Sequence, residues 1–155
     1  MSPRLQDELK QTRPWGNLQE EVAISILRTA AVLEHETAQV LKPAGITTTQ
    51  YNVLRILRGA EPDGLGRNEV RDRLISPVPD ATRLLDRLAD MGLVVRTRGG
   101  EDRRVVVARI TRAGLELIAP LDAVLERLHR RQLGHLGERK LRTLVGLLAE
   151  AREHP

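Results

Sequence analysis

The sequence predicts a mainly α-helical fold with a small β component (α+β), and two observations carry that prediction. The segment from Leu84 to Gly114 has the pattern of a short helix, a strand, a turn, a second strand and the start of another helix. Its turn, Gly99 to Arg104, is basic and lies between VVRTR and VVVARI, two runs rich in β-branched residues. Most of the remaining chain shows the apolar spacing of helices. A helix followed by a basic two-stranded ribbon is typical of a winged helix-turn-helix.

The composition favours a single domain over residues 1–155. Hydrophobic residues make up 41% of the chain, but Phe is absent and there is only one Trp and one Tyr, so the core has to be built from aliphatic side chains. The absence of cysteine excludes disulfides and thiolate metal sites. No apolar run approaches the length of a membrane span, and the start, MSPRLQDELK, lacks the apolar stretch of a signal peptide. We therefore expect a cytoplasmic protein.

The net charge of +4 is concentrated in one part of the chain. The segment from Arg67 to Arg112 contains eleven arginines against seven acidic residues, whereas basic and acidic residues balance elsewhere. Arginine binds phosphate and guanine through two parallel hydrogen bonds, which lysine cannot do. The location of the charge therefore favours a nucleic-acid contact over a merely solvated surface.

The first helix follows an arm. Residues 1–16 contain two prolines and a glycine and predict an extended arm without a helix. Asn17 and Glu20 have the spacing of a capping box. Apolar residues at helical intervals then continue to about Lys42, where a proline and a glycine end the helix; they are Val22, Ile26, Ala30, Leu33, Val40 and Leu41.

Three shorter helices come next. A second capping box, Thr47 with Gln50, starts the second helix, and a loop over residues 59–66 leads to a third helix at about 69–74. The turn SPVP (76–79) places Pro79 in the first turn of the fourth helix. That helix ends at Gly92, which suits a C-terminal cap. The buried side chains are expected to be Val53, Leu54 and Leu57 in the second helix and Leu84, Leu85 and Leu88 in the fourth.

Two helices follow the ribbon. Thr111 caps a fifth helix, in which Pro120 predicts a kink or a first turn broken from the rest. Glycines at 134 and 137 end it, and a sixth helix runs to about Arg152. Their apolar faces are formed by Leu115, Ile118, Leu121, Leu125 and Leu128, and by Leu141, Leu144, Val145 and Leu148. Together with the first helix they carry more apolar surface than one small lobe can cover, so we expect a dimer.

Five short motifs occur in order along the chain. They are T-x-x-Q-x-x-V-L at 47–54, T-R-L-L-D-R-L at 82–88, G-L-V at 92–94, D-x-R at 102–104 and I-T-x-x-G at 110–114. The ordered set, within residues 17–152, resembles the MarR family of bacterial transcription regulators. The proline-rich turn SPVPD departs from the family pattern, because many relatives have a segment rich in Ser or Thr there.

The resemblance implies an obligate homodimer that binds double-stranded DNA. Residues 17–45 and 112–153 would form the dimerisation helices, and residues 47–111 the DNA-binding lobe. Two lobes would read a near-palindromic operator, and the protein would be a repressor that responds to a small molecule. In the family the effector pocket lies between the dimer helices and the winged lobe; the candidates for it here are Trp15, His35, Tyr51 and Arg55.

Candidate DNA contacts lie on the fourth helix and in the wing. Arg83 and Arg87 are four residues apart and share a helix face, where Thr82 and Arg83 would meet base edges or phosphates in the major groove. The alternative for Arg87 is an ion pair with Asp86 or Asp90. The full set of candidates is Asp80, Thr82, Arg83, Arg87, Arg98, Asp102, Arg103 and Arg104.

Within the wing, the resemblance puts Arg104 in the minor groove, whose narrow, electronegative floor suits arginine. Arg103 would contact the DNA backbone, and Asp102 would brace the Arg104 guanidinium. The alternative is that Asp102 and Arg104 form a pair that only fixes the turn.

The sequence offers no convincing enzyme or metal site. His35-Glu36 begins an H-E-x-x-H pattern, but Gln39 stands where the second His is needed. No nucleophile–base set and no glycine-rich phosphate loop is present, so we expect neither an enzyme nor a cofactor. Two alternatives stay open beside the repressor: a dimeric winged-helix module that acts through protein partners, and a constitutive architectural DNA binder without a ligand. The localised arginine excess argues against the first.

Overall fold

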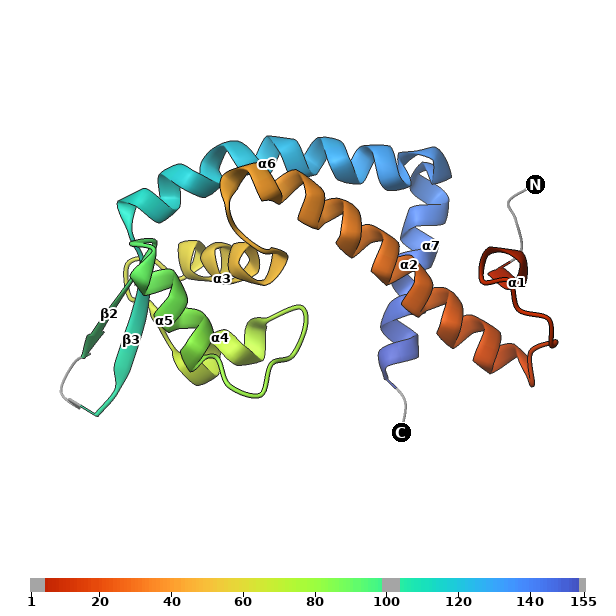
Figure 1. Cartoon of the computed structure of the whole chain (residues 1–155), viewed down its shortest axis with the longest axis horizontal. Coiled ribbons are helices and arrows are strands. Elements are labelled where there is room, and N and C mark those ends of the chain that lie inside the picture. Colours follow the sequence, from red (N-terminus) through yellow and green to blue (C-terminus); the bar gives the residue numbers. More distant parts are fainter. Residues whose placement is uncertain (1–4, 99–103, 154–155) are drawn as a thin grey trace. The chain divides into compact units, whose positions relative to one another are not determined.

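The computed structural model describes residues 5–98 and 104–153 and is mostly helical, with one small sheet (Figure 1). The chain divides into two compact units, Met1–Thr37 and Ala38–Pro155, and α2 runs from the first into the second. The elements in order are α1 (Leu5–Glu8), α2 (Leu18–Leu41), the 3-10 helix η1 (Lys42–Ala44), α3 (Thr48–Gly59), β1 (Leu65–Gly66), α4 (Arg67–Arg73), α5 (Thr82–Asp90), β2 (Val94–Arg98), β3 (Val106–Ile110), α6 (Arg112–Leu133), the 3-10 helix η2 (Gly134–Leu136) and α7 (Gly137–Arg152).

The N-terminal segment is not the helix-free arm that the sequence predicted. The prolines lie outside Leu5–Glu8, so nothing in LQDE prevents a helical turn, and the Leu9 amide donates to the Leu5 carbonyl at 3.0 Å. An ion pair of 3.7 Å joins Glu8 to Arg28 of α2. One turn of helix therefore interrupts the predicted arm.

Side-chain caps fix the starts of α2 and α3. Asn17 Oδ1 accepts the Glu20 amide at 2.8 Å, while the Glu20 carboxylate accepts the Gly16 amide at 2.7 Å. At α3 both halves of the capping box form: Thr47 Oγ1 accepts the Gln50 amide at 3.1 Å and Gln50 Oε1 accepts the Thr47 amide at 2.9 Å. The predicted start of the second helix is thus confirmed.

The core of the second unit is aliphatic apart from Tyr51, in line with the composition. Leucines from α3, α5 and α6 meet there, and among the described residues no buried side-chain polar atom lacks a hydrogen-bond partner. The largest fully buried side chains are Leu41, Leu54, Leu57, Leu85, Leu88, Ile118, Leu128, Val53 and Val70.

In the described part of the chain, no helix is both long and apolar enough to cross a membrane.

The sheet has three antiparallel strands in the order β1-β3-β2, one more than predicted. Val94 lies opposite Ile110 and Arg98 opposite Val106 in the β2–β3 ribbon, while Leu65 of β1 lies opposite Ala108. The predicted loop over residues 59–66 contains β1, which at two residues is too short to show alternation. A Cβ on Gly64 (φ 75°) would lie 2.5 Å from the Ala108 carbonyl oxygen, so only glycine fits this close approach.

Two details around α5 and α6 differ from the prediction. Helix α5 begins at Thr82, so Pro79 precedes the helix and does not occupy its first turn. Helix α6 is one element over residues 112–133 and contains Pro120, so a first turn broken from the rest is wrong. Thr111 caps α6 as predicted, because its Oγ1 accepts the Gly114 amide at 3.1 Å. The same hydroxyl donates to the Gly92 carbonyl at 2.7 Å, which joins the end of α5 to the start of α6.

Candidate nucleic-acid interface

Helix α5 has one buried face and one exposed face, which carries two arginines and two aspartates. Leu85 and Leu88 pack into the core, whereas Arg83 and Arg87 are exposed. Neither arginine makes a hydrogen bond or ion pair with another residue that the structure describes. The alternative ion pair for Arg87 is not formed: Asp86 pairs with Arg96 of β2, and within the described residues Asp90 makes no ion pair with Arg87. Two adjacent guanidinium groups on α5 are thus available to a partner.

The start of α5 is held by its own side chains. Asp80 Oδ1 accepts the Thr82 amide at 2.9 Å and the Thr82 hydroxyl at 2.7 Å, and these bonds hold the pKa of the Asp80 carboxyl below its usual range. Arg67 Nη1 of α4 donates to the Thr82 hydroxyl oxygen at 3.4 Å. Asp80 and Thr82 therefore act together to position the helix.

A second arginine ties α5 to the wing. Arg96 of β2 forms an ion pair with Asp86 of α5, and its side chain is 24% exposed. The pair connects the middle of α5 to the β2–β3 ribbon, which reaches beyond the helices in Figure 1. Nothing in the sequence singles out Arg96, because a ten-residue separation across a helix and a strand has no recognisable spacing.

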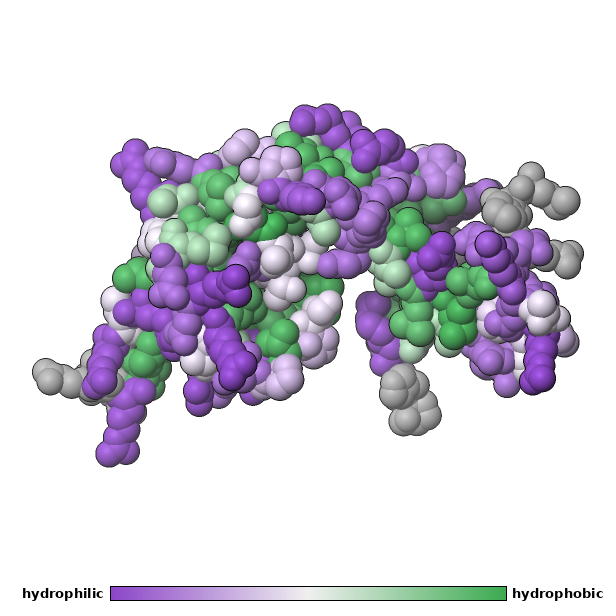
Figure 2. Space-filling model, viewed as in Figure 1, coloured by the Kyte–Doolittle hydropathy of each residue, from purple (hydrophilic) through white to green (hydrophobic). Residues whose placement is uncertain are grey.

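The wing itself carries two of the predicted arginines within the described residues. Arg98 ends β2 and Arg104 precedes β3, and both are exposed. Figure 2 shows hydrophilic side chains along this end of the molecule. Asp102 and Arg103 lie outside the described residues, so the bracing of Arg104 by Asp102 stays a prediction.

A basic hollow lies at the base of the wing, with a volume of about 390 Å³. Three guanidinium groups and one carboxylate line it, and the carboxylate of Glu69 also accepts the Gly66 amide at 2.9 Å. The lining residues are Gly66, Arg67, Asn68, Glu69, Arg96, Arg104, Val105 and Val106. Arg67 and Asn68 did not stand out in the sequence, although both begin the helix that precedes the SPVP turn.

The predicted effector residues are distributed over both units. Trp15 and His35 belong to the N-terminal unit, whereas Tyr51 and Arg55 lie on α3 of the second. Tyr51 is buried, its hydroxyl donates to Asp122 at 3.3 Å, and the Arg55 guanidinium lies 6.0 Å from the ring centre. Burial raises the pKa of the Tyr51 hydroxyl. The structure thus brings Tyr51 and Arg55 together.

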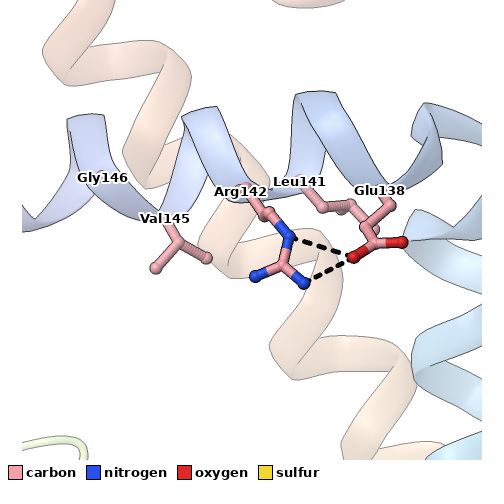
Figure 3. A pocket seen from close by; sticks show the side chains of 5 residues that line it. All are labelled: Glu138, Leu141, Arg142, Val145 and Gly146. Carbon is pink, nitrogen blue, oxygen red and sulfur yellow. Dashed lines mark hydrogen bonds and ion pairs between the residues drawn. The ribbon is translucent and has the colours of Figure 1, made fainter.

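Helix α7 presents an open apolar face. Leu141 and Val145 line a shallow hollow of about 450 Å³ along one side of the helix, next to the Glu138–Arg142 ion pair (Figure 3). Val145 is 68% exposed; Leu147, which is 58% exposed, lies outside this hollow.

Among the described residues, no group of three His, Asp or Glu side chains is placed to hold a metal ion.

Comparison with known proteins identifies the same combination of helices and wing elsewhere. A sequence model of the MarR family matches residues 44–105. The crystal structure of a MarR transcription factor from Planctomyces limnophilus is 38% identical, with a TM-score of 0.66; the match covers 88% of this chain and 98% of that one. The HTH-type transcriptional regulator FarR of Neisseria gonorrhoeae is 28% identical over 129 residues, which are 83% of this chain and 87% of FarR.

Similar structures have been solved with DNA bound. The transcriptional repressor CouR bound to a 23-mer DNA duplex is 26% identical, with a TM-score of 0.76, and the match covers 92% of this chain and all of CouR. A structure of CouR from Rhodococcus jostii RHA1 with p-coumaroyl-CoA shares the fold at 20% identity, with a TM-score of 0.71 and coverage of 91% and 98%.

Proposed function

The chain belongs to the MarR family of DNA-binding transcription regulators, and we propose that it is a homodimeric, ligand-responsive repressor of a near-palindromic operator. The observation that carries the proposal is the exposed arginine face of α5, fixed at its start by Asp80 and tied to the wing through Arg96. A helix that exposes Arg83 and Arg87 beside a basic ribbon matches a duplex, whose phosphates fix position and whose base edges carry the sequence.

We assign DNA reading to residues 47–111. Helix α5 enters the major groove, where Arg83 and Arg87 face base edges or phosphates, and Arg104 enters the adjacent minor groove. In a two-fold symmetric dimer, the two α5 helices read half-sites about 34–36 Å apart. This assignment predicts an operator whose two halves mirror each other.

We assign dimerisation to residues 17–45 and 112–153. The support is the apolar surface that α2 and α7 each expose: Leu27 and Val145 are 65% and 68% exposed, and Val22 is 49% exposed. Covering such side chains stabilises an association by about 25 cal/mol per Å² of apolar surface. A second copy of the chain is the occupant that the family pattern implies.

We also propose that a small molecule weakens operator binding. The support is family membership together with CouR, which shares the fold and is seen with p-coumaroyl-CoA. The candidate contacts are Trp15, His35, Tyr51 and Arg55. With so few aromatic side chains in the chain, an aliphatic pocket suits a lipophilic acid or a phenolic compound. A panel of such compounds, tested by thermal shift and by release of bound DNA, would identify the class.

The decisive experiment combines DNA binding and stoichiometry. Fluorescence anisotropy on promoter DNA next to the gene should show tight, sequence-selective binding that falls steeply with salt. Sedimentation should find two chains per operator and a dimer without DNA. Run-off transcription from that promoter should decrease when the protein is added.

Other outcomes would identify the alternatives. A flat salt response on promoter DNA would favour the module that acts through protein partners. Equal affinity for operator and scrambled duplex, with no compound releasing the DNA, would favour the architectural binder. A folded monomer at micromolar concentration would contradict the homodimer.

A further inference from the structure

The basic hollow at the base of the wing has donor groups that the protein itself does not use. Arg67 engages Nη1 with the Thr82 hydroxyl, and Arg96 engages Nη1 with Asp86. A guanidinium has five N–H donors, so within the described residues each arginine keeps its Nε and Nη2 donors unengaged. Both side chains line the same hollow, and the exposed amide of Asn68 lies beside them.

We propose that this hollow seats one backbone phosphate of the DNA duplex, with Arg67 and Arg96 as its ligands. The inference rests on the proposed function and adds to it a contact outside α5. Arginine matches phosphate through paired N–H···O bonds, and each guanidinium here is held by an internal hydrogen bond or ion pair. Preorganised donors lose little conformational entropy when the phosphate arrives.

A duplex phosphate suits this hollow better than a dissolved anion. The hollow is open and Arg67 is exposed, so solvent and salt screen the attraction for a single small ion. A phosphate within a bound duplex is presented at high effective concentration, because α5 and the wing already hold the same DNA. Under those conditions, donors that bind a dissolved ion only weakly are sufficient to hold the duplex phosphate.

The basic hollow is also connected directly to the start of α5. Arg67 contacts the Thr82 hydroxyl, which in turn donates to Asp80 at the start of α5. A phosphate bound by Arg67 is therefore held at a fixed place relative to the first turn of α5. Arg67 would act as a positioning contact that sets the register of α5 along the groove without reading a base.

The test is a scan with neutral methylphosphonates, one phosphate of the operator replaced at a time. In wild type, the methylphosphonate should lower affinity at one symmetric pair of operator positions. In Arg67→Gln, the same replacement should cause no further loss. The effects of the methylphosphonate and of the substitution are then strongly non-additive at those positions. Arg73→Gln is the matched control, since it removes the same charge from the same helix outside the hollow. Its scan should keep the wild-type pattern. Identical scans for the two variants would overturn the proposal.

Salt dependence gives an independent readout. Arg67→Gln should reduce the slope of log K against log[salt] by about 0.9 for each lobe on the DNA, equally for operator and scrambled duplex. Thermal melts should show that the variant remains folded. A loss confined to operator DNA would instead make Arg67 a base-reading residue and contradict the phosphate seat.

Two further arms separate the possible failures. Titration of the DNA-free protein with inorganic phosphate should show no saturable binding; binding that Arg67→Gln abolishes would assign the hollow to a dissolved anion and overturn the proposal. If wild type itself fails to bind any duplex, the proposed function fails. If wild type binds with a steep salt slope and Arg67→Gln keeps that slope, only the phosphate seat fails.

Discussion

Arg58 of α3 holds Asp122 of α6 with two hydrogen bonds, Nη1 to Oδ2 at 2.8 Å and Nη2 to Oδ1 at 3.0 Å. The Tyr51 hydroxyl donates to the same carboxylate at 3.3 Å. The two helices are thereby joined by a polar cluster as well as by the leucine core. Because α3 begins the segment proposed to read DNA and α6 is one of the helices proposed for dimerisation, this cluster connects the two proposed parts.

We predict that Asp122→Asn lowers the free energy of unfolding by at most about 1 kcal/mol, because an ion pair at the surface contributes little. The side chains of Arg58 and Asp122 are 32% and 49% exposed. Glu116→Gln is the control. Glu116 pairs with Arg112 on the same helix, and their side chains are 67% and 92% exposed, so this pair should contribute nothing measurable to the free energy of unfolding. Urea unfolding of the three proteins at pH 7 makes the comparison. If both variants lose the same free energy of unfolding, the cluster of Arg58, Tyr51 and Asp122 stabilises the fold no more than an ordinary surface ion pair.

The same pair should make stability fall at low pH. The hydrogen bonds from Arg58 hold the pKa of Asp122 below its usual range. The contribution is therefore complete above the unfolded-state pKa of about 3.9 and is lost as the pH falls through the lower folded-state pKa. Melting wild type and Asp122→Asn between pH 7 and pH 3 should show their difference shrinking only in the acid range. A difference that shrinks between pH 7 and pH 5 would contradict this.

Tyr51 should titrate above its ordinary range in the native state. Burial raises the pKa of its hydroxyl, Arg55 lowers it and Asp122 raises it again. Since the folded-state pKa is the higher one, the stabilisation is complete below about pH 10 and is lost as the pH rises through the folded-state value. Tyr51 is the only tyrosine, so absorbance at 295 nm reports it alone. Arg55→Gln should move the midpoint further up, and an unchanged midpoint would exclude the Arg55 contribution.

Local sequence rules predicted much of this fold because the responsible groups are neighbours in the chain. The Thr47–Gln50 box and the Thr111 cap each join residues three apart, and both formed as expected. The start of α5 differs from the prediction because Pro79 is compatible with a helical first turn, whereas the chain enters the helix only at Thr82, whose amide and hydroxyl both donate to Asp80.

The long-range contacts could not be predicted in the same way. Arg58 and Asp122 are 64 residues apart, and Arg96 meets Asp86 across a helix and a strand. Such pairs depend on how the elements pack, and no spacing in the sequence marks them. The strand β1 was missed for a related reason, since two residues acquire strand geometry only by pairing with Ala108 and Val107.

Gly114→Ala should destabilise the lobe by about 1–3 kcal/mol, the usual cost of overfilling a packed site. A Cβ at this position would lie 2.5 Å from the Leu93 carbonyl oxygen and 2.7 Å from Ile110 Cγ1. Gly134→Ala is the matched control, because nothing lies within 4 Å of its added Cβ and its backbone is right-handed helical. Thermal melts of both variants test the contrast. An unchanged melting temperature for Gly114→Ala would show that β2 and α6 can separate freely.

Arg83→Ala should relax sequence discrimination without unfolding the protein. A guanidinium that contacts a base through two bonds contributes about 1–3 kcal/mol at one symmetric pair of operator positions. Because Arg83 is exposed, the melting temperature should stay near that of wild type. Binding curves on operators with single base changes locate the affected positions. A uniform loss on all duplexes would mean that Arg83 contacts a phosphate.

Arg104→Ala should weaken binding to most sequences and reduce the preference for A·T pairs in the flanking minor groove. If Asp102 braces Arg104 as the sequence predicts, Asp102→Ala should reproduce part of this loss, because the guanidinium remains without that carboxylate. Operator and scrambled duplexes, measured beside thermal melts, give the readout. Operator affinity equal to wild type in Arg104→Ala, or a loss that merely follows unfolding, would contradict the wing assignment.

The Asp86–Arg96 pair has a consequence for how operators can vary. Because it ties α5 to the wing, we propose that the two elements contact the DNA at a set spacing within each lobe. One extra base pair adds about 3.4 Å of length and about a tenth of a turn. Such an insertion between the bases read by α5 and the minor-groove segment read by the wing would put one element out of phase. Natural operators should therefore keep the layout within each half constant, and any variation in length should fall between the halves.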